Sequence, residues 1–171
     1  ATVLLGLSAP VMAACASAVK LTSRGPVFFR QVRVGLGGRP FEILKFRTMT
    51  VDAERHGQAV WAKANDQRVT AIGGFLRSCR LDELPQLLNV VQGDMRLIGP
   101  RPERPQFVAQ LAKAVPEYLR RHSIPPGITG LAQVQRSYDA SLDDVVTKLK
   151  YDLFYVDNRC LMLNVKILMK T

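Results

Sequence analysis

The stretch Arg77–Pro105 reads RSCRLDELPQLLNVVQGDMRLIGPRPERP and is the part of the sequence around which the fold and the chemistry are organised. It places two adjacent carboxylates, Asp82 and Glu83, shortly after Arg77, and it closes on a stiff, basic Pro-Arg-Pro corner centred on Arg101. An acid pair near guanidinium groups can hold a divalent cation. It can also supply a nucleophile to a phosphate whose charge the arginines neutralise.

The acid pair has a second interpretation, in which it is only a surface feature. The apolar spacing over residues 75–91 predicts a helix, and neighbouring side chains on a helix point about 100° apart. Asp82 and Glu83 can converge on one cation if Pro85 kinks this helix or starts a new one. A solvent-exposed acid pair bridged to Arg77 and Arg80 fits the spacing at least as well.

The composition indicates a globular protein with an anionic partner. The chain has 171 residues, and 24 Lys and Arg against 14 Asp and Glu give a net charge of +10. Such a surplus indicates nucleic acid, an anionic membrane surface or a phosphorylated substrate. Because the basic residues are scattered rather than gathered in a patch with aromatic residues between them, nucleic acid is disfavoured. The three cysteines lack CxxC spacing, which argues against a zinc site or a disulfide framework.

A charge-free segment, Ala1–Val19, opens the chain. As a helix about 30 Å long, it would match the hydrocarbon core of a bilayer. A signal peptide, a spanning helix and a re-entrant helix remain open, because no basic segment precedes the run and Pro10 would bend it at its centre. Lys20 and Arg24 follow, which places this end on the cytoplasmic side. The chain begins without Met, so we expect a fragment of a longer protein.

The rest of the chain predicts a mainly helical α+β fold. Residues 27–34 and 41–47 read as two strands joined by a glycine-rich turn, which makes a small hairpin. Amphipathic helices are expected over residues 105–121, where Pro116 is a candidate break, and from Ser141 to about Asn158. The apolar tail, residues 161–169, is too short to span a bilayer and could be a core helix or lie at a membrane surface.

Motifs at and around the acid pair resemble the bacterial sugar transferases, the monotopic phosphoglycosyl transferases. The resemblance runs in order over nearly the whole chain. The stretch Trp61–Val108 and the Tyr151-Asp152 segment are closest to the branch that serves exopolysaccharide export. The family motifs are Gly25-Pro26-Val27-Phe28-Phe29-Arg30-Gln31 with Arg33-Val34-Gly35, Lys45-Phe46-Arg47-Thr48-Met49, Leu81-Asp82-Glu83-Leu84-Pro85-Gln86-Leu87, Gly93-Asp94-Met95, Ile98-Gly99-Pro100-Arg101-Pro102, and Pro126-Gly127-Ile128-Thr129-Gly130 with Ala132-Gln133-Val134.

The resemblance implies an enzyme that transfers sugar-1-phosphate from a UDP-sugar to polyprenyl (undecaprenyl) phosphate and releases UMP. By carry-over, Asp82 is the nucleophile that forms a covalent phosphosugar intermediate, and Glu83 is the ligand of Mg²⁺. Lys45, Arg77 and Arg101 match basic positions of the family and would stabilise phosphate charge. Arg136 is a further candidate phosphate contact, although the family often has Asn-Gly-Arg where this chain has Gln135-Arg136-Ser137.

The resemblance also implies an architecture. Residues 1–22 would form a re-entrant membrane helix, and residues 23–171 a catalytic domain on the cytoplasmic face of the bacterial inner membrane, surrounded by amphipathic interfacial helices. The implied partners are the UDP-sugar, polyprenyl phosphate and membrane lipid, without nucleic acid, and a homodimer is left open. Two departures stand out: Ala9 precedes Pro10 where the family has serine, and Asn164 stands where many members have Asp.

Two other classes of function compete with the enzyme. A non-catalytic membrane scaffold would use the basic surface to bind anionic lipid, and it would tolerate loss of both Asp82 and Glu83. A nucleic-acid-binding protein would show salt-sensitive affinity for DNA or RNA.

Overall fold

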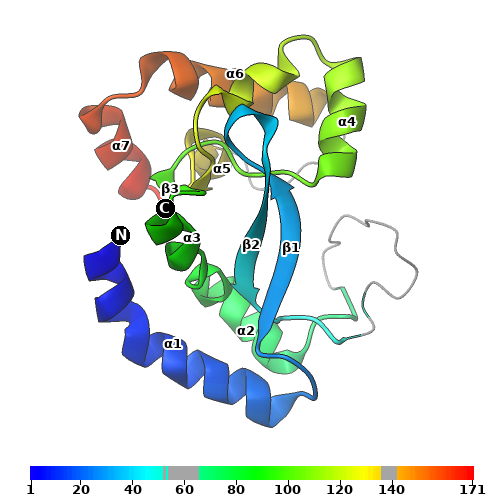
Figure 1. Cartoon of the computed structure of the whole chain (residues 1–171), viewed down its shortest axis with the longest axis vertical. Coiled ribbons are helices and arrows are strands. Elements are labelled where there is room, and N and C mark those ends of the chain that lie inside the picture. Colours follow the sequence, from blue (N-terminus) through cyan, green and yellow to red (C-terminus); the bar gives the residue numbers. More distant parts are fainter. Residues whose placement is uncertain (52, 54–65, 136–141) are drawn as a thin grey trace. The chain divides into compact units, whose positions relative to one another are not determined.

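The computed structural model describes residues 1–51, 53, 66–135 and 142–171, so Trp61 and Arg136 lie outside the described residues. Within them the fold is the expected mainly helical α+β arrangement, with two small two-stranded sheets (Figure 1). The chain divides into two compact units, residues 1–30 with 44–88 and residues 31–43 with 89–171. The elements are α1 (Thr2–Thr22), β1 (Phe28–Val34), η1 (Leu36–Gly38), β2 (Pro40–Phe46), α2 (Ala71–Ser78), η2 (Leu81–Glu83), α3 (Gln86–Gln92), β3 (Arg96–Ile98), α4 (Pro105–Ala114), η3 (Tyr118–Ser123), β4 (Gly127–Thr129), α5 (Leu131–Gln135), α6 (Leu142–Asn158) and α7 (Leu161–Leu168).

Helix α1 runs through Pro10 without a break, and its ribbon bends part-way along (Figure 1). A proline inside a helix lacks the amide hydrogen for the bond to the preceding turn, which accounts for a bend. The Ser8 hydroxyl donates to the carbonyl of Leu5 at 3.1 Å, so it bonds back into the helix just before the proline. Among the described residues, α1 is the helix that is long and apolar enough to cross a membrane.

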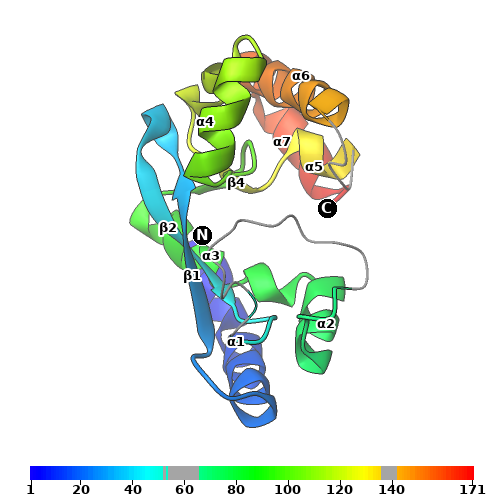
Figure 2. The ribbon, with the colours of Figure 1, turned by 90° about the vertical axis from the view of Figure 1, so that its right-hand side faces the viewer.

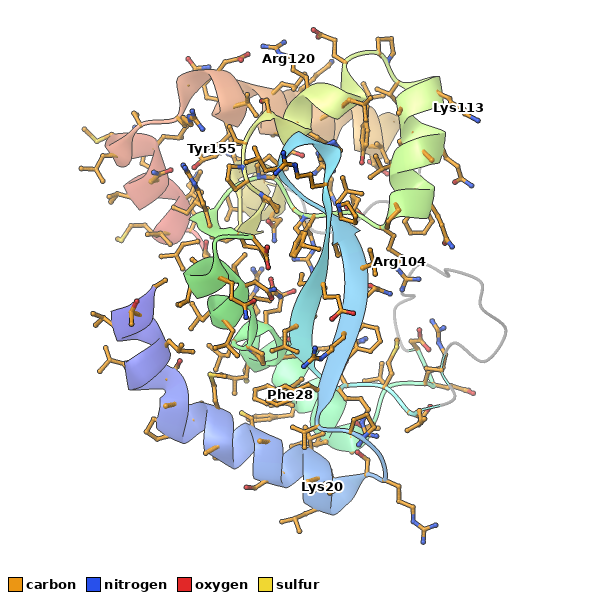
Figure 3. All side chains as sticks on the ribbon, in the orientation of Figure 1. Lys20, Phe28, Arg104, Lys113, Arg120 and Tyr155 are labelled. Atoms are coloured by element: carbon orange, nitrogen blue, oxygen red, sulfur yellow. The ribbon has the colours of Figure 1, made fainter. Side chains whose placement is uncertain are left out.

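One side of α1 packs into the core of the first unit. Cys15 and Val19 are buried against Phe46 of β2 and Leu76 of α2. Phe28, at the beginning of β1, stacks on Phe46 with 5.5 Å between ring centroids (Figure 3). The remaining surface of α1 leaves large apolar side chains exposed, namely Val3, Leu4, Leu7, Val11 and Leu21.

The predicted hairpin is confirmed. Strands β1 and β2 pair with each other, and Gly37 and Gly38 adopt positive φ in the turn between them, at 62° and 79°. Glycine enters this left-handed region without the steric cost that a side chain brings, so the glycine-rich sequence makes the tight reversal possible.

The predicted helix over residues 75–91 is wrong in its middle. Helix α2 ends at Ser78, and Arg80 then adopts a left-handed conformation with φ 55°. The 3-10 turn η2 follows, and α3 begins directly after Pro85. The restart after Pro85 was expected from its sequence position. The break at Arg80 was not, because nothing in an arginine marks a positive φ.

In the second unit, helices α4 to α7 gather with β4 (Figure 2). Strands β3 and β4 pair in parallel, with Arg96 opposite Gly127 and Ile98 opposite Thr129. A side chain on Gly127 would collide with the backbone of Gly99, so the glycine permits this close pairing. Pro116 follows the last turn of α4, which confirms the expected break.

A buried ion pair links η3 to α6. The Arg121 guanidinium donates to Asp152 from Nε at 3.0 Å and from Nη2 at 2.6 Å, and both side chains are almost fully buried. Burial opposes charge on both partners, yet the attraction of Asp152 raises the pKa of Arg121 above its ordinary value. Burial raises the pKa of Tyr118 to about 12, so Tyr118 stays neutral and accepts a third bond from Arg121 at 3.0 Å.

Helix α7 packs by Ile167 and is linked to α6 by Tyr155 (Figure 3). The Tyr155 hydroxyl donates to Asn164 Oδ1 at 2.8 Å. A carboxylate oxygen could accept the same bond, which gives the Asn-for-Asp departure at this position a structural explanation.

His122 should make the protein less stable in acid. Its two ring nitrogens are buried, and neither has a hydrogen-bond partner within the described residues. Burial, followed by the charge of Arg121, lowers the pKa of His122 from 6.5 to about 4. The unfolded chain therefore takes up the proton first, and stability should fall as pH falls from 6.5 towards 4.

The effect on the free energy of unfolding should reach roughly 2 kcal/mol near pH 4. The measurement is the thermal midpoint of the protein and of His122→Phe between pH 7.5 and 4.5. The phenylalanine keeps the edge contact with Tyr118 but cannot titrate. Identical pH slopes for the two proteins would contradict the assignment.

Candidate active site

The end of strand β2 carries the first residue of the candidate site. Lys45 Nζ donates to Glu83 Oε1 at 2.6 Å, and both side chains are mostly buried. Phe46 points the other way, into the core with α1 and α2, as strand alternation requires. The sequence did not predict which carboxylate Lys45 would meet.

Arg47 binds the segment that follows α1. Its guanidinium donates to the carbonyl oxygen of Ser23 at 2.9 Å, to the Ser23 hydroxyl at 2.7 Å and to the carbonyl oxygen of Arg24. It therefore binds the carbonyl-rich C-terminal end of α1, where positive charge is favourable. This residue is 5% exposed, so its charge is largely withdrawn from solvent.

The two side chains of the acid pair are largely buried rather than solvent-exposed. Asp82 is 9% exposed, and the Glu83 side chain is 15% exposed. The surface interpretation, in which the pair is solvent-exposed and bridged to Arg77 and Arg80, is therefore wrong about exposure. Burying carboxylates is costly unless the fold gives them partners, so this turn holds them for a reason other than solubility.

The turn of residues 79–85 sets the position of the acid pair. Arg80 redirects the chain by its positive φ, and η2 holds Asp82 and Glu83 in a single tight turn that ends at Pro85. A left-handed arginine costs of order 1 kcal/mol, and such strain persists where the surrounding structure fixes it.

Arg77 lies in the same unit as Lys45 and the acid pair. Its Nε donates to the Thr48 hydroxyl at 2.8 Å. Arg101 belongs to the second unit, where its carbonyl oxygen accepts a bond from Arg121 at 2.9 Å. Arg136 lies outside the described residues. The structure thus gathers four of the six predicted site residues into one unit.

The donor set allows one kind of metal site. Among the described residues, no group of three or more His, Cys, Asp and Glu side chains could hold a metal ion. Mg²⁺ keeps several water ligands and is commonly held by one or two carboxylates together with substrate phosphates. Asp82 and Glu83 fit that pattern, whereas a closed structural site would need more ligands than the described residues bring together.

A comparison of the sequence with protein families identifies the chain. The profile of the bacterial sugar transferases matches residues 1–171. The chain belongs to the bacterial sugar transferase family. The family membership that the sequence motifs predicted is therefore confirmed.

Named relatives of this family member come from several bacteria. It is 48% identical over its whole length to the UDP-N-acetylgalactosamine-undecaprenyl-phosphate N-acetylgalactosaminephosphotransferase of Aeromonas hydrophila, of which it covers 40%. It is 43% identical over 99% of its length to the UDP-glucose:undecaprenyl-phosphate glucose-1-phosphate transferase of Klebsiella pneumoniae, of which it covers 37%. The protein of the latter name in Escherichia coli K12 is 41% identical over the whole chain, with 37% of the relative covered. The chain thus spans about two fifths of the length of these relatives.

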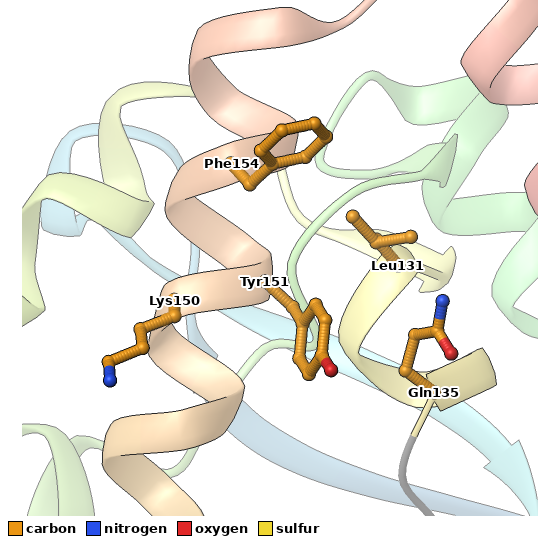
Figure 4. A pocket seen from close by; sticks show the side chains of 5 residues that line it. All are labelled: Leu131, Gln135, Lys150, Tyr151 and Phe154. Atoms are coloured by element: carbon orange, nitrogen blue, oxygen red, sulfur yellow. The ribbon is translucent and has the colours of Figure 1, made fainter.

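The second unit of this sugar transferase contains a pocket whose lining differs from the surroundings of the acid pair (Figure 4). Its volume is about 390 Å³, and Tyr151 lies at its centre beside Gln135. Lys150 points away from both, and the lining contains no carboxylate. The pocket therefore lacks the carboxylate nucleophile that the family resemblance implies, and the acid pair remains the candidate active site. The lining residues are Leu131, Gln135, Lys150, Tyr151 and Phe154.

Sequence reasoning also missed an ion pair in the first unit. Asp66 accepts from the Arg68 guanidinium at 2.8 Å and 2.6 Å. The pKa of Asp66 is held well below its ordinary value. The largest cause is the hydrogen bond from the Arg68 side chain, followed by the bond from the Arg68 backbone amide and by the charges of Arg68 and Arg77. The Asp-x-Arg spacing is the only local signal of this pair.

Removing the Lys45 ammonium group should make the folded protein less stable. In Lys45→Met, Glu83 keeps its position in η2 but loses the ammonium group 2.6 Å away, while the apolar stem is preserved. We expect the free energy of unfolding to fall by about 1 to 2 kcal/mol. Thermal unfolding would measure the loss, and Lys113→Met, on the exposed side of α4, is the control. Equal midpoints for the two variants would contradict a stabilising role for Lys45.

Proposed function

We propose that this protein transfers sugar-1-phosphate from a UDP-sugar to polyprenyl phosphate and releases UMP. Asp82 is the nucleophile, Glu83 is the ligand of Mg²⁺, and Lys45 and Arg77 neutralise phosphate charge. Arg101 and Arg136 are proposed as further phosphate contacts. The names of the relatives, which include transferases acting on undecaprenyl phosphate, support the proposal.

The observation that carries the proposal is the buried acid pair with cations in the same unit. Asp82 is almost fully buried, Glu83 is bound by Lys45, and Arg77 is held nearby in the fold by Thr48. A scaffold that binds anionic lipid through basic side chains does not need buried carboxylates, which are costly to remove from water.

In the first step, a carboxylate oxygen of Asp82 attacks the β-phosphorus of the UDP-sugar. A bond forms between this oxygen and phosphorus, and the bond from phosphorus to the bridging oxygen breaks. The electron pair leaves with that oxygen, so UMP departs and the sugar phosphate stays on Asp82 as an acyl phosphate. Arg77 and Lys45 stabilise the negative charge on the transferring group, which is the largest catalytic contribution in phosphoryl transfer.

In the second step, a phosphate oxygen of polyprenyl phosphate attacks the same phosphorus. The bond to Asp82 breaks, the carboxylate is regenerated, and the product is a polyprenyl-diphosphate-linked sugar. Mg²⁺, when bound with the substrate, would neutralise diphosphate charge and make UMP a better leaving group. The burial of Asp82 keeps bulk water from hydrolysing the intermediate before the lipid arrives.

The lipid substrate requires the protein to meet a membrane. We propose that residues 1–22 form a re-entrant helix whose basic end, beginning with Lys20, faces the cytoplasm, and that residues 23–171 act on the inner face of the bacterial inner membrane. The bend of α1 and its exposed apolar side support re-entry. Helix α7 would lie on the membrane surface, because it exposes Leu161, Met162, Val165 and Leu168 alongside Lys166.

The test is UMP release by the protein in lipid nanodiscs. UDP-glucose, UDP-galactose and their N-acetylated forms are supplied in turn with undecaprenyl phosphate and Mg²⁺. We expect release with at least one donor, dependent on the lipid for continued turnover and on the metal. Absence of release from every donor would overturn the proposed function.

A further inference from the structure

Arg77 reaches the end of strand β2 by one defined contact. Its Nε donates to Thr48 Oγ1 at 2.8 Å, and the side chain of Arg77 is half-buried. A guanidinium carries its N–H groups in a rigid plane, so a bond at Nε fixes the direction in which the rest of the group points. The two Nη nitrogens then form the edge that remains for a ligand, and this edge matches the spacing of phosphate oxygens.

Thr48 is itself held firmly. The amide of Thr70 donates to the Thr48 carbonyl at 3.0 Å, and Met49 pairs with Val69 in an isolated antiparallel bridge. Thr48 is 7% exposed. Its hydroxyl therefore sits on a backbone that is hydrogen-bonded on the side facing α2.

The beginning of α2 is anchored on the same residue. Thr70 caps the helix by accepting from the amide of Gly73 at 3.0 Å. A side chain on Gly73 would collide with the Thr48 carbonyl, so the helix approaches as closely as glycine allows. Residues four apart lie on one face of a helix, which brings Arg77 above Gly73 and against the Thr48 hydroxyl.

Arg77 has a competing partner nearby. It lies close enough to Asp66 to help lower the pKa of that carboxyl. Within the described residues, the recorded hydrogen bond of the Arg77 side chain is the one to Thr48. Without that hydroxyl, the long side chain of Arg77 could turn towards Asp66. Its positive charge would then interact with this carboxylate instead of with a substrate phosphate.

We propose that the Thr48 hydroxyl is a positioning group for the transferase reaction: it orients the Arg77 guanidinium so that its Nη edge is presented to the diphosphate of the donor. This inference rests on the proposed function, in which Arg77 binds phosphate. It assigns a role to the threonine that follows Lys45-Phe46-Arg47, a residue that does not itself touch the reacting atoms.

The experiment compares Thr48→Val, which removes the hydroxyl and keeps the shape, with Thr48→Ser, which restores the hydroxyl. For Thr48→Val we expect kcat/KM for UMP release to fall about tenfold to 150-fold, the range for losing a hydrogen bond to a charged group. Thr48→Ser should stay within about threefold of the unmodified protein. Thr147→Val is the matched control, because the Thr147 hydroxyl donates to the Asp143 carbonyl of its own helix, and it should leave kcat/KM unchanged.

A double-mutant cycle separates positioning from simple structural support. In an Arg77→Ala background, Thr48→Val should change kcat/KM and the UDP-sugar dissociation constant by less than about twofold, because the residue it positions is gone. An equal loss in both backgrounds would overturn the proposal, as would full activity of Thr48→Val beside an active unmodified protein. If the unmodified protein released no UMP from any donor, the proposed function would fall first.

Discussion

Replacing Asp82 by asparagine should reduce UMP release by at least about a thousandfold, because an amide cannot form the acyl phosphate. Asparagine has nearly the same volume, so the packing around the buried position should survive. The unmodified protein, given a UDP-sugar and Mg²⁺ but no polyprenyl phosphate, should gain the mass of one sugar phosphate. Intact-protein mass spectrometry measures this gain, and Asp82→Asn should show none.

Asp143→Asn is the control for the loss of one carboxylate. Asp143 is exposed in the first turn of α6, and its variant should keep UMP release and the adduct. Full turnover of Asp82→Asn would disprove the nucleophile assignment. If Asp82→Ala with Glu83→Ala also left function intact and Mg²⁺ made no difference, the scaffold interpretation would replace the enzyme.

Replacing Asp152 by asparagine should cost about 3 to 5 kcal/mol of unfolding free energy. The change leaves the Arg121 guanidinium buried without its counter-charge, although the bonds to Tyr118 and to the Arg101 carbonyl remain. Loss of a partner from a buried pair is costly because the other charge stays out of water. Chemical denaturation in detergent, followed by tyrosine fluorescence, measures the loss.

The neighbouring arginine supplies the matched control. Arg120 donates to both oxygens of Asp157 at 2.6 Å and 2.7 Å, in a geometry as good as that of the buried pair, but on the surface. Asp157→Asn should cost no more than about 1 kcal/mol. Similar losses for the two variants would mean that burial of Arg121 and Asp152 has no energetic consequence.

Features with a local cause were predictable from the sequence. The glycine-rich turn of the hairpin, the helix restart after Pro85 and the helix end before Pro116 all follow from residues whose backbone preferences act on their own neighbours. The left-handed Arg80 and the parallel pairing of β3 with β4 were not predictable in this way. The parallel pairing depends on contacts between residues distant in the sequence, and neither an arginine nor a short apolar run gives a local signal of these features.

The candidate site also has a part that the sequence predicts and a part that depends on the fold. The sequence shows that Asp82 and Glu83 are adjacent, and the motif match suggested their roles. Which cation meets which carboxylate depends on the fold: Lys45 reaches Glu83, and Arg77 reaches Thr48. Arg47, adjacent to both contacts, binds backbone oxygens instead. Spacing alone could not separate these three cations, because it records neither partner nor burial.

The packing of α1 on the end of strand β2 limits how a water-soluble form of the protein can be engineered. Deleting α1 would uncover Phe46 and Leu76 and would remove the helix that leads into Ser23 and Arg24, whose carbonyl groups Arg47 binds. A soluble variant would therefore have to retain the helix and exchange only its outward apolar side chains for polar ones. The positions to exchange are Val3, Leu4, Leu7, Val11 and Leu21, while Cys15 and Val19 stay.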